Sequence, residues 1–147
     1  MKGAEVREQI LEQHAELREM LAGLEPLVKR FEPGSRMVAE ELCERGLALY
    51  EKLAAHLDLE DDLLVAALRA VREGGQERAE DLAAEHREQR ELLEFLIGRL
   101  TRECRPTSLV ARELRSFIDC LREDMDDEEA TLLAPEVLGD VERASPQ

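Results

Sequence analysis

The chain has 147 residues, a length that corresponds to about one domain. It is 44% hydrophobic and 37% charged but only 3% aromatic, a profile that favours long helices and argues against a β-sandwich, a barrel or a disordered chain. The formal charge of -15 repels nucleic acids and anionic membranes, so we expect neither as a partner.

Three stretches rich in glycine, proline or capping hydroxyls interrupt an otherwise helical pattern, and Pro135 ends it. Loops this short favour antiparallel neighbours, so the sequence predicts an all-α fold, an up-down-up-down four-helix bundle. We expect a single domain over residues 1–147, with its core at about 4–135 and a short tail at 136–147. The interruptions lie at 32–35, 74–75 and 105–108, and the predicted helices at about 4–31, 36–73, 76–103 and 108–133.

Each predicted helix carries one apolar stripe, traced by steps of three and four residues. Polar residues interrupt every stripe near its middle. In chain order the stripes are Val6, Ile10, His14, Leu17, Leu21, Leu24 and Val28; Leu42, Leu49, Leu53, His56, Glu60, Leu63, Ala67 and Val71; Ala79, Leu82, His86, Arg90, Leu93, Ile97 and Leu100; and Val110, Leu114, Phe117, Leu121, Asp124, Glu128 and Leu132.

The rise of 1.5 Å per residue brings the four interruptions to about the same height in the bundle. Burying polar groups there costs several kcal/mol each unless they are paired or bind a metal. A lone histidine is most often a satisfied core residue, but all three histidines of this chain fall in this layer. The predicted layer contains His14, His56, Glu60, His86, Arg90, Asp124 and Glu128.

Two residue pairs in this layer have the i,i+4 spacing that places side chains on one helix face, His56 with Glu60 and Asp124 with Glu128. Imidazole and carboxylate together are donors for iron, manganese or zinc. The second pair is the weaker indication, because it belongs to an acidic run over 123–129 that a solvated face would also explain. Its register with Leu121 and Leu132 favours the inward orientation.

Four segments resemble the helix signatures of the hemerythrin-like, or HHE cation-binding, family. They are Ile10-Leu11-Glu12-Gln13-His14, His56-Leu57-Asp58-Leu59-Glu60, Glu85-His86, and the run from Asp124 through Glu128-Glu129 and Leu132-Leu133 to Pro135. The resemblance extends from about residue 4 to 135. It implies a four-helix bundle with a non-haem di-iron centre that handles oxygen, nitric oxide, peroxide or iron status.

Carried onto this chain, the resemblance implies terminal nitrogen ligands at His14, His56 and His86. It implies bridging carboxylates at Glu60 and Glu128.

Two positions depart from the family pattern. Asp124 stands where the fourth helix usually carries a histidine, and Arg90 stands where hemerythrins proper carry a second histidine on the third helix. The two could form a salt bridge that fills the place of one metal, or Asp124 could be an oxygen ligand. We favour the second alternative, because His86 would otherwise have no metal to bind. A third carboxylate ligand should stabilise ferric iron.

We therefore expect a metal-binding protein with two iron ions per chain, zinc or manganese being alternatives. It would sense, bind or scavenge oxygen, reactive oxygen or nitrogen species, or iron, with O2, NO or peroxide as the small ligand. A di-iron enzyme that reduces peroxide or nitric oxide is a second hypothesis, disfavoured because no separate acid-base device is evident. A metal-free or mononuclear bundle that binds other proteins is the third.

The location we expect is the cytoplasm, because no apolar run approaches the length needed to span a bilayer. The three cysteines are widely spaced and odd in number, which predicts reduced thiols that act as packing residues.

Overall fold

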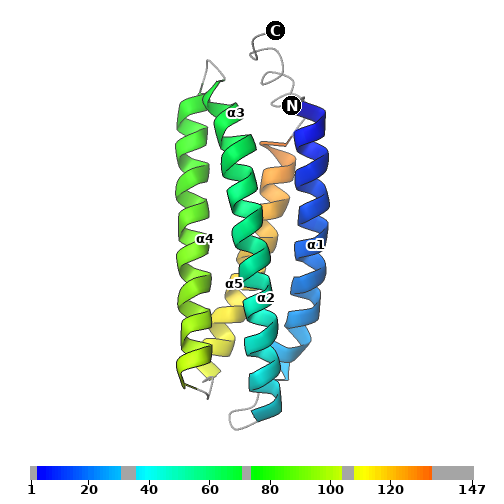
Figure 1. The fold of residues 1–147 in the computed structure, drawn as a ribbon, viewed down its shortest axis with the longest axis vertical. Helices are drawn as coiled ribbons and strands as arrows, with labels where there is room; N and C mark the ends of the chain where they lie inside the picture. The colour runs from blue at the N-terminus through cyan, green and yellow to red at the C-terminus, as the bar shows by residue number, and fades with distance from the viewer. Residues whose placement is uncertain (1–2, 31–35, 71–73, 104–107, 134–147) are drawn as a thin grey trace.

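The computed structural model describes residues 3–30, 36–70, 74–103 and 108–133, and it is a bundle of long helices (Figure 1). The main helices are α1 (Gly3–Lys29), α2 (Arg36–Glu60), α4 (Gly75–Glu103) and α5 (Ser108–Ala130). In Figure 1 α1 and α4 run in one direction and α2 and α5 in the other. Both α1 and α4 pack against α2 and α5. The predicted all-α, up-down-up-down four-helix bundle is confirmed.

The helix ends agree with the predicted punctuation where the structure describes it. Gly74 has φ of 71°, a left-handed conformation that glycine adopts without a steric penalty, and α4 begins directly after it. The predicted turns at 32–35 and 105–107, together with Pro135 and the tail, lie outside the described residues.

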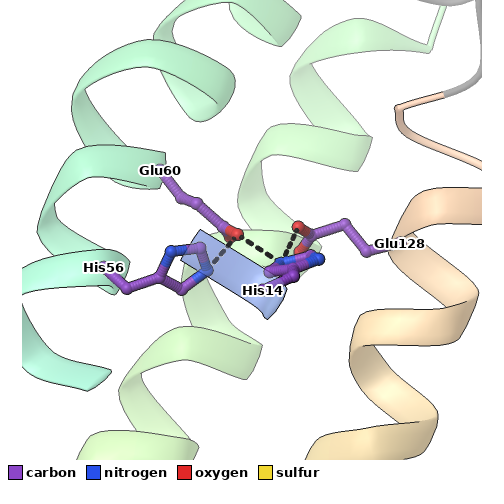
Figure 2. Close-up of side chains that lie close together, drawn as sticks. All are labelled: His14, His56, Glu60 and Glu128. Atoms are coloured by element: carbon purple, nitrogen blue, oxygen red, sulfur yellow. Dashed lines mark hydrogen bonds and ion pairs between the residues drawn. The ribbon is translucent and has the colours of Figure 1, made fainter. Parts of the chain in front are cut away.

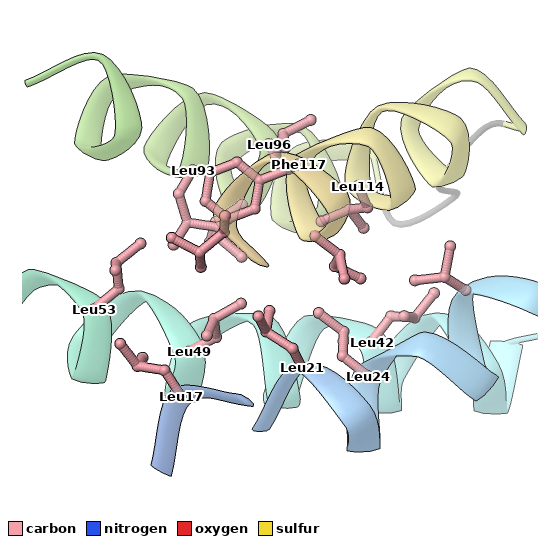
Figure 3. Close-up of a cluster of buried hydrophobic side chains, with 14 of the residues drawn as sticks. Leu17, Leu21, Leu24, Leu42, Leu49, Leu53, Leu93, Leu96, Leu114 and Phe117 are labelled. Atoms are coloured by element: carbon pink, nitrogen blue, oxygen red, sulfur yellow. The ribbon is translucent and has the colours of Figure 1, made fainter. Parts of the chain in front are cut away.

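Leucines from all four long helices form the main core, in which the side chains of α1 and α2 face those of α4 and α5 (Figure 3). A smaller apolar cluster lies nearer the N-terminus of α1, around Val6, Ile10 and Leu64. The predicted stripe of the first helix is buried along its whole length. The polar layer lies between these two apolar regions, which exclude water from it on both sides.

The second predicted stripe is wrong beyond Glu60. There α2 passes into a π-helical turn, η1 (Asp61–Val65), and then into a short α3 (Ala66–Arg69). A π turn takes up more residues than an α turn, so it rotates the residues that follow. The fully buried side chains are therefore Leu64, Val65 and Leu68 rather than the expected Leu63 and Ala67, which are partly buried. Val71 lies outside the described residues.

Over the described ranges, no helix combines the length and apolar character needed to cross a membrane. Cys43 is partly buried and packs against the main core, as predicted for a packing residue. Cys120 is exposed, so that prediction is wrong for it. The stripe that runs through Phe117, Leu121 and Asp124 in steps of four and three residues turns position 120 outwards. Cys104 lies outside the described residues.

Candidate metal centre

Three helices bring His14, His56, Glu60 and Glu128 together in the polar layer (Figure 2). His14 lies on α1, His56 and Glu60 lie one turn apart at the end of α2, and Glu128 lies near the end of α5. The three side chains from α1 and α2 are at most 4% exposed, and that of Glu128 is 10% exposed. One possible ligand atom from each of the four residues lies within 4.8 Å of the others.

Glu60 is the centre of this cluster, because all three histidines direct Nε2 at its carboxylate. Its Oε1 lies 2.6 Å from His56 Nε2 and 3.2 Å from His14 Nε2. Its Oε2 lies 2.9 Å from Nε2 of His86, which reaches in from α4 and is 2% exposed. On the other side of the cluster, Glu128 Oε1 lies 3.2 Å from His14 Nε2. Oε1 of Glu60 thus faces His14 and His56, whereas Oε2 faces His86.

The outer nitrogens of two imidazoles are held by hydrogen bonds. His56 Nδ1–H donates to Gln13 Oε1 at 2.7 Å, and His86 Nδ1–H donates to Asp61 Oδ1 at 2.7 Å. With Nδ1 protonated, a neutral imidazole presents a lone pair at Nε2. Lone pairs therefore face the carboxylate oxygens of Glu60. That arrangement is repulsive unless the imidazoles are protonated or a cation lies between the two groups.

Three buried polar atoms of the cluster lack a hydrogen-bond partner among the described residues: His14 Nδ1, Glu60 Oε2 and Glu128 Oε1. Buried polar groups are rarely left without a partner, and a site for a bound ion is one common reason. Glu60 Oε2 lies close to His86 Nε2 without hydrogen-bond alignment, a spacing that suits two ligands of one ion. The donor set and its unsatisfied atoms therefore fit a bound metal.

Without metal, the cluster holds protons instead. Burial disfavours the imidazolium of His14, but Glu128 and Glu60 outweigh burial and raise its pKa to about 9. Burial raises the pKa of Glu128 to about 8. Burial would also raise the pKa of Glu60, but its contacts with the three histidines hold that pKa well below the usual range. Metal ions compete with these protons, because coordination needs deprotonated ligands.

The family model described as the hemerythrin HHE cation binding domain matches residues 5–134. The chain belongs to this family. No curated protein and no solved structure matches the chain. Membership of an HHE cation-binding family and a buried His/Glu cluster together support metal binding.

Arg90, where hemerythrins proper carry a histidine, does not pair with Asp124, so the salt bridge considered from the sequence is wrong. Its Nη2 donates to Asp58 Oδ1 at 2.7 Å and to Asp61 Oδ2 at 2.9 Å. The guanidinium thus points towards the end of α2 and the start of η1, where these two carboxylates lie. Since Asp61 also accepts from His86, Arg90 holds the carboxylate that orients this imidazole.

His14 also has a carboxylate beside its outer nitrogen, and an arginine binds that carboxylate. His14 Nδ1 lies 3.5 Å from Glu129 Oε2, and Arg18 binds both Glu129 and Asp126. Two of the three histidines thus have a carboxylate behind them that an arginine holds in place.

Asp124, the second departure from the family pattern, lies beside the cluster. It accepts a hydrogen bond at Oδ2 from Gln89 Nε2 at 2.8 Å. Burial and the charge of Asp124 raise the pKa of nearby Glu85 to about 7. A cavity of about 10 Å³, room for about one water molecule, is lined by Asp124 together with His86, Glu128 and the rest of the cluster.

The residues that support the cluster were not predicted from the sequence: Gln13, Asp61, Gln89 and Glu129. Gln13 and Asp61 directly adjoin His14 and Glu60 in the sequence, and a search for polar neighbours of candidate ligands would have found them. Gln89 carries no comparable signal, because its role depends on how α4 and α5 face each other.

Proposed function

We propose that this chain is a non-haem iron protein that binds two iron ions in the polar layer and senses or scavenges a small oxygen- or nitrogen-containing ligand. The observation that carries the proposal is the Glu60 carboxylate, 1% exposed, with three imidazole Nε2 atoms at 3.2, 2.6 and 2.9 Å. Such a cluster is stable only with protons or with metal ions.

The first ion would be held by His14, His56, Glu60 and Glu128, whose candidate ligand atoms lie within 4.8 Å of one another. The second would be held by His86 and the other oxygen of Glu60, with Asp124 from α5. The unpartnered Glu60 Oε2 beside His86 supports this second position. Imidazole and carboxylate donors suit iron, and also zinc and manganese.

Bound iron would supply redox chemistry and an affinity for small ligands such as O2, NO or peroxide. The chain supplies the positions of the ligands and a dry surrounding, since leucines close the layer above and below. The volume beside the cluster has room for about one water molecule, so it disfavours large ligands. These features support a binder, sensor or scavenger more than an enzyme that turns over a larger substrate.

Metal analysis of protein purified without chelator, together with its optical spectrum in air, tests the proposal. We expect about two iron ions per chain, by analogy with paired metal sites, and absorption in the near ultraviolet that a zinc protein lacks. His56→Ala should abolish stoichiometric binding, because it removes the imidazole nearest to Glu60. Glu51→Ala, an exposed change on the same helix, is the matched control.

A His56→Ala protein with full metal content and an unchanged spectrum would refute the ligand assignment. A measured content near one metal ion per chain would support the proposed first site and exclude the proposed second site.

A further inference from the structure

A groove of about 260 Å³ lies between α4 and α5. It is larger than the cavity at the metal centre, which holds about 10 Å³. Apolar cavities of about 150 Å³ accept benzene or xenon, so the groove has room for a small molecule. Its lining residues are Glu85, Glu88, Gln89, Leu92, Phe117, Cys120, Leu121 and Asp124.

The groove adjoins the metal centre, because Gln89, Leu121 and Asp124 line both cavities. The hydrogen bond from Gln89 Nε2 to Asp124 Oδ2, 2.8 Å long, crosses from α4 to α5 at this boundary. A molecule in the groove is therefore separated from the centre by one side-chain pair and one leucine.

Two kinds of side chain define what the groove admits. Leu92, Phe117 and Leu121 form an apolar wall that suits a molecule with little hydration. Glu85, Glu88 and Asp124 place carboxyl groups around it, and carboxylates in a site walled by apolar side chains repel anions. The chain's charge of -15 adds to this repulsion.

We propose that the groove between α4 and α5 is the route by which small uncharged ligands reach the metal centre, with the Gln89–Asp124 pair as its inner boundary. This inference rests on the proposed function. It adds a selection by charge: neutral molecules such as nitric oxide enter readily, and anions such as azide enter slowly.

Cys120 offers a way to block the groove, because it is exposed and lines it. N-Phenylmaleimide forms a thioether with this thiol, and the phenyl group that it carries adds bulk at the groove. The matched control is Cys120→Ser treated with the same reagent, in which any reaction at Cys43 or Cys104 is preserved. We expect nitric oxide to bind the labelled iron-loaded wild type about tenfold more slowly than the labelled control. Association rates of closely related complexes commonly differ by about one to three powers of ten, so a change of this size is measurable.

A second measurement uses metal-free protein and xenon, a neutral apolar probe. Xenon should shift the NMR signals of Leu92 and Leu121, and labelling of Cys120 should remove these shifts. If the protein binds no iron, the proposed function fails, but the xenon measurement still decides whether the groove admits neutral molecules. Equal nitric oxide rates in the two labelled proteins, or xenon bound elsewhere only, would overturn the inference even if iron is present.

The charge selection has its own test. Glu88→Gln should raise the ratio of the azide rate to the nitric oxide rate by about two- to threefold at low salt, because it removes one repelling charge. The matched control is Glu94→Gln, an exposed change on α4 away from the groove. A ratio that responds equally to both changes would refute selection by the groove.

Discussion

Metal-free protein should lose stability as pH rises from about 6 to about 9, because the folded chain holds protons that the unfolded chain releases. The pKa of His14 rises from 6.5 to about 9 on folding. Its contribution is fully present below pH 6.5 and is lost as pH rises through about 9. Glu128, whose pKa rises to about 8, acts in the same direction.

The size of the effect follows from His14. A pKa difference of about 2.5 units corresponds to about 3 kcal/mol of unfolding free energy. Glu128 Oε1 lies 3.2 Å from His14 Nε2, so the two groups share one interaction and their contributions are not summed. Replacing Glu60 by Gln removes one of the two carboxylates that raise the pKa of His14, and the dependence on pH should become weaker.

Urea unfolding of chelator-treated protein at about pH 6 and about pH 9 measures this difference. We expect wild type to be less stable at the higher pH by most of those 3 kcal/mol, and Glu60→Gln to show a smaller change. Iron-loaded wild type should respond in the opposite sense, since metal ions displace protons more easily as pH rises. A wild-type stability that stays constant or increases between the two pH values would refute the account of the cluster.

Three further predictions concern the departures from the family pattern and the charge of the chain. Arg90→Gln should lower metal affinity about tenfold, measured by chelator competition, because Asp61 then holds His86 less firmly; Arg90→Lys should restore part of it. Asp124→His should preserve two metals per chain and alter the spectrum, since it exchanges one donor for another; an unchanged metal content with an unchanged spectrum, or a wild-type stoichiometry near one with no metal gained by the variant, would exclude Asp124 as a ligand. The protein should not bind arbitrary duplex DNA, and salt-sensitive micromolar binding in a titration would contradict this.

The bundle and most of its buried residues could be predicted because the helical period relates sequence position directly to a helix face. His14, His56 and His86 fall on apolar stripes, and all three are buried in the structure. The π turn could not be predicted in this way. It changes the period within one helix, and the residues at 61–65 carry no pattern that distinguishes it from an α-helical turn.

The partner of Arg90 could not be predicted from the sequence either. Sequence periodicity placed Arg90 and Asp124 at one height, but height does not determine which neighbouring helix a long side chain faces. The guanidinium binds Asp61, the first residue of the π turn, and Asp58, which lies three residues earlier on α2. Asp61 also accepts a hydrogen bond from His86, so one carboxylate makes both contacts.

The distribution of charge around the centre connects these contacts with the proposed ligand. Arg18 and Arg90 bind Glu129 and Asp61, carboxylates that contact the outer nitrogens of His14 and His86. Their positive charges are therefore paired outside the cluster. Glu60 and Glu128 within it have no arginine partner among the described contacts, and the carboxyl groups of the groove add further negative charge. Negative surroundings stabilise the more highly charged state of a metal ion and repel anions. If the centre binds iron as proposed, the ferric state and neutral ligands are favoured together, which suits sensing or scavenging better than reversible oxygen carriage.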